Sequence, residues 1–548
     1  MSFRSGLKSK RIKYSLRHDT LIKNKHVFFN SDQMKYSTTI LILMSLLCSN
    51  IYAQKHDYNW LIGYVTVTQE TANRNGMRID FNGDQVQATI FTKEQSFYLT
   101  NLAYSDAEGA LQLYSPGCAF FDENGVLFEN GSDIHAGPFF CDGDSDSDYP
   151  ANQGMLALPT SDPDIVTVFY NEEIIGQDTS GVYIYVNVLK ALLDIRQNIV
   201  LSKKETLLDS LSGNILSATK HANGQDWWII NQDYFTNEYK CLLISEGEVI
   251  DTVSTFIGNP IVAHGAQQSN FSPDGSMFAR FNPSDELQLY DFDRSTGKLS
   301  NFRFIDVPST LEGTLHSGGL SFSGSSRFLY VNDALGIWQY DLEANNLADS
   351  GVQVAERDTF ASDIAGLGVI SVPTFFYRMA LAPDCRIYMS SRNGVDRIYV
   401  IMEPEQKGEA CHVVQNILIP VSNVGTTPHY PNYRLDNEPF CDSSKAFPDN
   451  LMTTVSTPET ATPISRIHVF PNPARDQCKL YLKHVNARQV KFQLTDLLGR
   501  PMRTQDIEVN NGEVITNIDI SSIPTGIYFY TVYSKGEILL TDRLIIEK

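Results

Sequence analysis

Four aspartates at alternating positions are the sharpest candidate for chemistry in this sequence. They are Asp142, Asp144, Asp146 and Asp148, in the stretch CDGDSDSDYPANQG. Calcium favours clustered carboxylate oxygens on a loop, and a spacing of two residues is typical of loop sites. The Gly at the sixth position and the Glu at the twelfth that an EF-hand needs are missing. A calcium site at Asp142, Asp144 and Asp146 is therefore one hypothesis, and a solvated acidic loop is the other; no further cofactor is indicated.

Motifs of the common enzyme classes do not occur in the sequence. We find no G-x-S-x-G elbow for a serine nucleophile, no H-E-x-x-H for zinc and no G-x-x-x-x-G-K-[ST] for phosphate. The repeated S-x-D-x-G boxes of sialidases are missing as well. The sequence thus offers no established set of catalytic residues, and any chemistry depends on how the strands bring distant side chains together.

The elements that position these residues are short strands in a repeating pattern. Alternating apolar and polar residues flank turns of Pro-Asp-Gly or Asn-Gly type, which is typical of β-hairpins. Four copies place Gly224, Gly275, Ser326 and Cys385 at the equivalent turn position, in steps of 51, 51 and 59 residues. A period of this size predicts an all-β protein with a β-propeller of about seven blades over 56–441. A stack of β-sandwich domains is the alternative.

Three histidines recur near the expected ends of inner strands, namely His221, His264 and His316. Inner strands line the central channel of a propeller, so these side chains could form a ligand or metal site there. The alternative is that they are polar caps of channel-facing strands.

The propeller region resembles a known family. The segments NQGMLALP, ATKHANGQDWWII, FSPDG, LAPDCRIYMS and HYPNYRL follow one another in the order found in secreted WD40-like or YVTN-like propellers of Bacteroidota, often of the gliding-motility-associated type. This sequence departs from the pattern at APDC and SGSS, where the usual turn glycine is missing. The resemblance supplies no catalytic residues.

A second compact unit follows a spacer. Residues 442–463 are rich in Ser, Thr and Pro and predict an extended linker. Residues 464–548 have the pattern of a small immunoglobulin-like β-sandwich, and they resemble the type A C-terminal sorting domain of the type IX secretion system. The residues that match this domain are Pro471, Asn472, Pro473, Asp496, Gly499, Arg500, Gly526, Tyr528 and Lys548. An ordinary immunoglobulin-like binding module is the alternative.

The other end of the chain has features of export. Residues 1–53 form a basic extension followed by a predicted signal peptide, whose apolar stretch precedes Ala53 and Gln54 at the expected cleavage point. The apolar run is shorter than the roughly 20 residues that span a bilayer, so we expect no transmembrane anchor in the mature chain. Together with the resemblance of the tail, this predicts passage through the periplasm and release or attachment outside the cell.

The charge of the chain limits its partners. The formal net charge is −21, although residues 1–53 contain nine Lys and Arg and only two Asp, so the remainder is still more acidic. Such a surface repels nucleic acid and anionic membranes. We expect an unidentified extracellular ligand and the type IX machinery as partners, and no nucleic acid.

Seven cysteines follow the signal peptide, and an exported protein can oxidise them. Cys118 and Cys141 flank one loop and are the first candidate pair; Cys411 and Cys441, near the closure of the ring, are the second, and the sequence leaves the pairing open. An odd number leaves at least one thiol free.

Three functions fit these observations. The chain is a secreted or surface-held binding or adhesion module, or a component of a surface or motility apparatus, or an enzyme of the lactonase or quinoprotein type with a channel-centred metal. The enzyme requires three or four polar ligands that converge at the channel mouth.

Overall fold

The computed structural model is built almost entirely from β-strands. It describes residues 54–63, 75–92, 97, 99–135, 141, 149–178, 181–211, 216–233, 236–260, 267–283, 286–308, 318–364, 368–448, 451, 466–470, 472–483, 487–497, 499–509 and 514–548. Within these ranges the only helical elements are the short 3-10 turns η1 (Ala348–Ser350) and η2 (Gly408–Cys411). The described part of the chain is therefore all-β, as predicted.

Seven sheets follow one another along the chain, and we call them blades 1 to 7. Blades 1 and 2 have three described strands each: β1 (Asn59–Ile62), β2 (Asn75–Asp80) and β3 (Gln87–Thr92), then β4 (Leu102–Ser105), β5 (Leu111–Ser115) and β6 (Phe121–Asp122). Blade 3 contains β7 (Met155–Pro159), β8 (Ile165–Asp178), β9 (Gly181–Asp194) and β10 (Ile199–Leu211). Blade 4 contains β11 (Ser217–Lys220), β12 (Trp227–Gln232), β13 (Glu238–Ser245) and β14 (Glu248–Phe256).

The remaining blades have four strands each. Blade 5 contains β15 (Gln268–Phe271), β16 (Met277–Asn282), β17 (Glu286–Asp293) and β18 (Lys298–Ile305). Blade 6 contains β19 (Gly319–Phe322), β20 (Phe328–Asn332), β21 (Gly336–Asp341) and β22 (Val352–Glu356). Blade 7 contains β25 (Phe376–Leu381), β26 (Ile387–Ser391), β27 (Val395–Ile401) and β28 (Val413–Asn423). A separate hairpin, β23 (Thr359–Ile364) with β24 (Gly368–Pro373), lies between blades 6 and 7.

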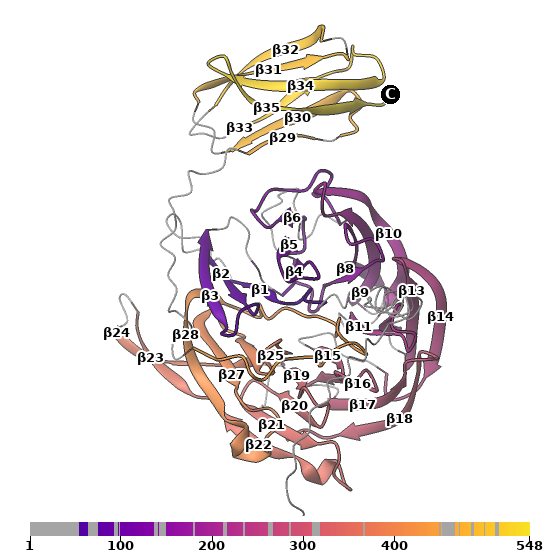
Figure 1. The fold of residues 1–548 in the computed structure, drawn as a ribbon, viewed down its shortest axis with the longest axis vertical. Coiled ribbons are helices and arrows are strands. Elements are labelled where there is room, and N and C mark those ends of the chain that lie inside the picture. The colour runs from indigo at the N-terminus through magenta and orange to yellow at the C-terminus, as the bar shows by residue number, and fades with distance from the viewer. Residues whose placement is uncertain are drawn as a thin grey trace, which may run out of the picture. The chain divides into compact units, whose positions relative to one another are not determined.

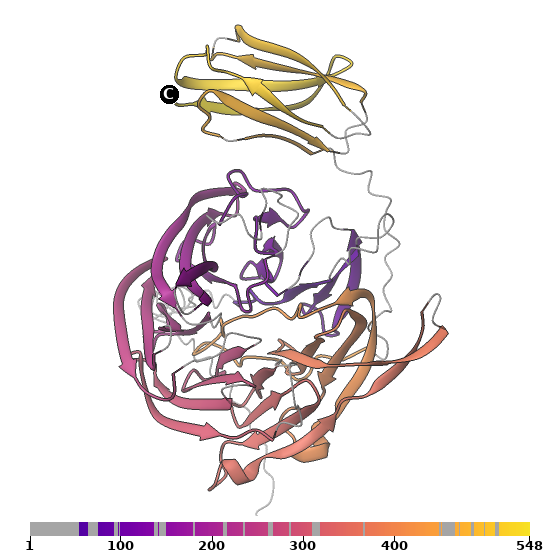
Figure 2. The same ribbon diagram turned by 180° about the vertical axis from the view of Figure 1, so that it is seen from behind.

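The blades form a closed ring, which Figures 1 and 2 show from opposite sides. Seven hydrophobic clusters each contain buried residues of two consecutive blades. One of them joins blade 7 to blade 1, where Trp60 and Phe81 pack with Tyr388 and Val400. Since one blade cannot cover both of its faces, each blade covers the next until the ring closes. This geometry confirms the prediction of a propeller with about seven blades.

The repeated turns explain the period of the sequence. Gly224, Gly275, Ser326 and Cys385 have φ angles of 75°, 70°, 65° and 65°, so all four are left-handed. In each turn the backbone N–H of this residue donates to the carbonyl three residues earlier. Ser326 and Cys385 thus adopt the conformation that glycine favours. The two departures from the family pattern leave the turn itself unchanged.

The C-terminal strands form a separate two-sheet sandwich. One sheet contains β29 (Arg466–Phe470), β30 (Gln477–Lys483) and β33 (Val514–Asp519), and the other contains β31 (Gln489–Thr495), β32 (Pro501–Glu508), β34 (Gly526–Ser534) and β35 (Glu537–Ile546). A single core between the sheets includes Leu480, Phe492, Ile518, Val532 and Leu544. These seven strands confirm the predicted immunoglobulin-like sandwich.

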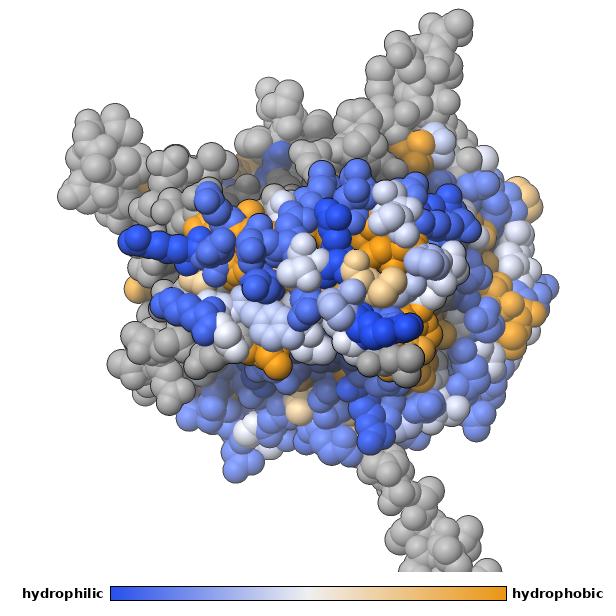
Figure 3. All heavy atoms as spheres, turned by 90° about the horizontal axis from the view of Figure 1, so that it is seen from above, coloured by the Kyte–Doolittle hydropathy of each residue, from blue (hydrophilic) through white to orange (hydrophobic). Residues whose placement is uncertain are grey.

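The face of the molecule drawn in Figure 3 is mostly hydrophilic. Figure 3 shows blue polar residues over the viewed face, with hydrophobic residues gathered in separate orange patches. Large exposed apolar side chains include Phe256, Ile250, Leu497, Phe529 and Ile538.

Candidate functional site

The central channel of the propeller is occupied by the chain itself. Residues 424–435, which we call the channel segment, follow the last strand of blade 7 and run through the ring. At one end, near the starts of β4 and β25, Asn101 Nδ2 donates to Thr426 O at 2.7 Å, and Arg378 Nη1 lies 3.4 Å from Gly425 O. At the far end, Asn432 Nδ2 donates to the carbonyl of Pro273, just after β15, at 2.7 Å. The channel segment therefore spans the channel from one mouth to the other.

Two tyrosines of the channel segment fasten it to the blades it passes. Tyr433 OH donates to Ala157 O at 2.7 Å, and Tyr430 OH donates to Asn59 O at 3.1 Å. Tyr433 is fully buried and packs in the cluster between blades 3 and 4. The segment is thus an integral part of the core rather than a surface loop.

Amide side chains join the inner strands around it. Gln153 Nε2 donates to Ser269 O at 2.7 Å, and Gln153 Oε1 accepts from Ser269 N at 2.8 Å. Gln268 Nε2 donates to Met379 O, and its Oε1 accepts from Met379 N and from Leu320 N. Each glutamine side chain bonds the backbone of another blade as a neighbouring strand would, because its amide both donates and accepts. Blades 3, 5, 6 and 7 are connected in this way where no continuous sheet links them.

His429 lies at the centre of this network. Its ring accepts from Gln153 Nε2, with 3.0 Å between that atom and Nδ1, and its Nε2 lies 3.5 Å from Ser217 Oγ. Burial, together with the charge of Arg378, lowers the pKa of His429 to about 3. Burial also lowers the pKa of Arg378 to about 10. The imidazole is therefore neutral at ordinary pH, and the charge beside it is the guanidinium of Arg378.

The Ser217 and His429 pair does not have the geometry of a nucleophile and its base. A catalytic hydrogen bond spans about 2.6–3.2 Å, whereas this distance is 3.5 Å. The hydroxyl of Ser217 already bonds Ser269 O at 2.9 Å. An efficient general base has a pKa near the working pH, and that of His429 is far lower. These residues act as structural hydrogen-bonding groups.

The burial of His429 predicts acid sensitivity. Its folded pKa of about 3 lies below the unfolded value of 6.5, so below pH 6.5 the unfolded chain binds a proton that the folded chain does not. Stability should fall as pH decreases from 6.5 towards 3, by about 1.4 kcal/mol per pH unit from this residue. Denaturant unfolding of the wild type and of His429→Gln between pH 7 and 4.5 measures this. An equally steep pH dependence in both proteins would contradict it.

Near the end of the channel segment the chain is clamped by an ion pair. Arg434 Nη1 lies 2.6 Å from Asp57 Oδ1, and both side chains are 2% exposed. Burial alone would lower the pKa of Arg434, but the carboxylate of Asp57 outweighs it and the pKa is raised. The guanidinium also donates to Phe440 O through Nε at 2.9 Å and through Nη2 at 2.7 Å. This pair joins the first and last described parts of the propeller.

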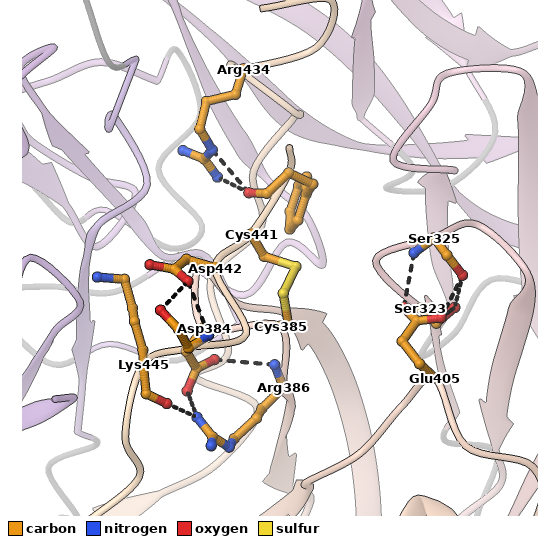
Figure 4. The surroundings of a disulfide bond; sticks show 12 residues. Ser323, Ser325, Asp384, Cys385, Arg386, Glu405, Arg434, Cys441, Asp442 and Lys445 are labelled. Atoms are coloured by element: carbon orange, nitrogen blue, oxygen red, sulfur yellow. Dashed lines mark hydrogen bonds and ion pairs between the residues drawn. A yellow bond between two sulfur atoms is a disulfide. The ribbon is translucent and has the colours of Figure 1, made fainter. Parts of the chain in front are cut away.

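A disulfide holds the chain a few residues later. Cys441 is bonded to Cys385, the left-handed residue of the blade 7 turn, as Figure 4 shows. The prediction that Cys441 pairs with Cys411 was wrong, because Cys411 is fully buried in the cluster between blades 6 and 7. The other predicted disulfide, Cys118 with Cys141, is present. Cys385, at a position that favours glycine, thus anchors the chain just beyond the channel segment.

A small cleft remains beside the channel segment. It has a volume of about 50 Å³, and its lining includes Thr219, Asn270, Ser321, Tyr430 and Phe440. Sites for drug-sized ligands measure roughly 300–1,000 Å³. The cleft has room for a few water molecules or for one end of a larger ligand.

Of the three predicted channel histidines, His221 is the one that the structure describes. His221 lies in the turn between β11 and β12, half-buried, with its Nδ1 accepting from Asn223 N at 3.0 Å. His264, His316 and the aspartates Asp142, Asp144 and Asp146 lie outside the described residues. Within the described part, no group of three or more His, Cys, Asp or Glu could hold a metal ion. Calcium at the aspartates stays a prediction, which melting curves with calcium and with chelator test.

The motif residues of the sorting domain build its turns and edges. Asp496 accepts from the Arg500 backbone N at 2.9 Å and from its Nε at 2.6 Å, across a turn in which Gly499 has a φ of 76°. Asn472 donates to Arg543 O and accepts from Ile545 N, both at 2.8 Å. Tyr528 OH donates to Pro524 O at 2.9 Å.

The remaining motif residues lie near these contacts. Lys548 donates through its backbone N to Thr525 Oγ1 at 3.2 Å and through Nζ to Ser521 O. Gly526 begins β34, and Pro473 follows Asn472. Pro471 lies outside the described residues.

The tail matches a known protein family. Residues 468–547 match the secretion system C-terminal sorting domain. The match confirms the sorting domain of the type IX secretion system and the localisation predicted with it: the protein is exported and is secreted or held at the cell surface. Among the described residues, no helix is long and apolar enough to cross a membrane.

Comparisons of the whole chain add no closer relative. No curated protein matches it. Among solved structures, it is similar to the periplasmic gluconolactonase PpgL of Pseudomonas aeruginosa, with 12% identity over 84% of this chain and 99% of that chain and a TM-score of 0.32. It is also similar to a putative 6-phosphogluconolactonase of Bacteroides fragilis, with 11% identity over 85% of this chain and 99% of that chain and a TM-score of 0.31. Scores this low say nothing about activity, and the propeller is established by the geometry of its own sheets.

Proposed function

We propose that the protein is a binding or adhesion module that the type IX secretion system delivers to the cell surface or the medium. The loops and blade edges of the propeller are available for binding, and the sorting domain directs the export of the chain. A role as a component of a surface or motility apparatus uses the same surfaces and belongs to this proposal.

The channel segment favours binding at the exposed faces over a site inside the channel. A site in the middle of the channel needs room there for its substrate. Here a substrate would have to displace His429, Tyr430 and Tyr433 from buried hydrogen bonds. Each buried polar group left unsatisfied costs about 1–3 kcal/mol. Recognition at the exposed faces avoids this cost, and the acidic surface favours neutral or cationic ligands.

Loss of the gene tests the proposal. Cells that lack the chain should attach less to a glass surface or to one another, and expression of the full chain should restore attachment. Unchanged attachment would contradict a role in adhesion. The purified chain should not accelerate the hydrolysis of δ-gluconolactone beyond a heat-treated sample. An acceleration would favour the lactonase alternative instead.

We also propose that the chain belongs to the gliding-motility-associated propellers of Bacteroidota. The ordered propeller motifs and the sorting domain support this, and the spreading of the deletion strain on soft agar tests it.

The domain boundaries are proposed as 56–441 for the propeller, 442–463 for the linker and 464–548 for the sorting domain. The linker begins anchored, because Lys445 Nζ donates to Gly83 O and Ala446 N to Asp84 O, both at 2.8 Å.

The proposed mature chain begins at Gln54, after cleavage of a signal peptide behind Ala53. Gln54 is held by the propeller: its Oε1 accepts from Lys220 Nζ at 2.5 Å, and its carbonyl accepts from Arg434 Nη1 at 3.1 Å. A chain that starts at Gln54 would keep both contacts. Mass spectrometry of the exported protein should find Gln54 as the first residue. Peptides from upstream of Ala53 in exported material would contradict this.

A further inference from the structure

The outer face of the larger sorting-domain sheet is unusually apolar at one end. Leu497, Met502, Ile527 and Phe529 are 67%, 41%, 46% and 41% exposed, and we call them the apolar corner. Strand β34 alternates between the core residues Tyr528 and Tyr530 and the exposed Ile527 and Phe529. An antiparallel sheet that covers a core normally turns a polar face to water. The corner is therefore an exception that folding does not require.

The strand register gathers these four residues. Phe529 pairs with Thr495, the last residue of β31, and Thr495 also pairs with Pro501, which precedes Met502. Leu497 follows β31 in the turn at the same end of the sheet. Ile527 pairs with Ile545, which extends the apolar surface onto β35. Exposed apolar patches on soluble proteins mark interaction sites.

The motif residues of the family support this corner from beneath. The contacts of Arg500 with Asp496 hold the turn that presents Leu497, and Tyr528 fixes the strand that presents Ile527 and Phe529. The exposed Arg543 pairs with Phe529 across the strands and places positive charge beside the corner. The motif residues thus hold the turn and the strand on which the residues of the apolar corner are exposed.

We propose that the apolar corner is the surface by which the secretion machinery docks the chain. The tail is a sorting domain, so a component of the machinery must contact it. A stable dimer buries about 800 Å² per partner, which is more than four side chains cover, so the corner fits a reversible contact. Its partner is a protein surface with an apolar depression and carboxylates at the rim.

The test compares matched surface variants of the full chain in the producing cell. Ile527→Ser with Phe529→Ser should lower the amount at the surface and in the medium about tenfold and raise the amount in the periplasm, which corresponds to about 1.4 kcal/mol of docking free energy. Ile538→Ser is the control, because Ile538 is 64% exposed and pairs with Tyr533 near the other end of the same sheet. Normal export of the double variant, or an equal loss in the control, would overturn the proposal.

Further measurements distinguish the possible causes of an export defect. If the double variant melts at a lower temperature than the wild type, Leu497→Ser decides the question, because Leu497 lies in a turn and its export defect should have the same direction. Normal export of Leu497→Ser would then overturn the proposal. A dimer of the purified mature chain that the double variant abolishes would show that a second copy, not the machinery, occupies the corner. Removal of the whole tail tests the sorting function separately.

Discussion

Replacement of Arg434 by methionine should lower the free energy of unfolding by about 3–5 kcal/mol. The change leaves the carboxylate of Asp57 buried without its partner, at a site where both side chains are 2% exposed. It also leaves the carbonyl of Phe440 without its two donors from this guanidinium. Denaturant unfolding of the mature chain, followed by the fluorescence of the propeller tryptophans, measures the effect.

An exposed ion pair provides the control for this variant. Arg196 and Asp164 lie 3.4 Å apart with side chains 78% and 43% exposed, and Arg196→Met should change the stability by less than about 1 kcal/mol. If Arg434→Met were as mild as the control, the clamp would contribute little to holding the ends of the propeller. The double variant with Asp57→Asn should regain part of the loss, because it removes the uncompensated charge.

Removal of the disulfide by Cys385→Ser with Cys441→Ser should lower the stability by about 4 kcal/mol, as the chain-entropy model predicts for a loop of this length. The cross-link joins residues separated by 56 positions. It also holds the chain just beyond the channel segment, so the variant should be cleaved by protease after residue 435 faster than the wild type. Thermal melting and limited proteolysis of the two proteins measure the two effects.

The second disulfide separates the two effects of this variant. Cys118→Ser with Cys141→Ser opens a loop of 23 residues and should cost about 3 kcal/mol, without faster cleavage beyond the channel segment. Equal proteolysis of both variants would mean that Cys385 and Cys441 stabilise the whole propeller but do not fasten this segment in particular.

The architecture was accessible from the sequence because it depends on local signals. The turns at Gly224 and Gly275 repeat at a fixed period, and the alternation of the strands between them identifies the blades. Even the departures at Ser326 and Cys385 keep the left-handed backbone of the turn. The sandwich of the tail was equally accessible, since its motif residues act within single turns and neighbouring strands.

The interior of the channel was not accessible in the same way. His429 and Arg378 meet Gln153 and Leu99 across more than 270 positions, and no local pattern records such a contact. The departure at Cys385 did contain a signal, because a cysteine at a turn position built for glycine needs a reason. Its bond to Cys441 is that reason, but the position of Cys411 near the closure of the ring favoured Cys411 as the partner. Of the histidines that recur with the blades, His221 bonds within its own turn, and a channel site at His264 and His316 stays a prediction.

The central claim is that the sorting domain exports a propeller that is complete without it. The most direct measurement is the distribution of the full chain and of a chain truncated after Pro463 among periplasm, cell surface and medium. The cut lies beyond Leu451, which is buried against blades 1 and 7, so the propeller keeps its core. We predict that the truncated chain melts like the propeller of the full chain but stays in the periplasm. Export of the truncated chain at the normal level would contradict the account.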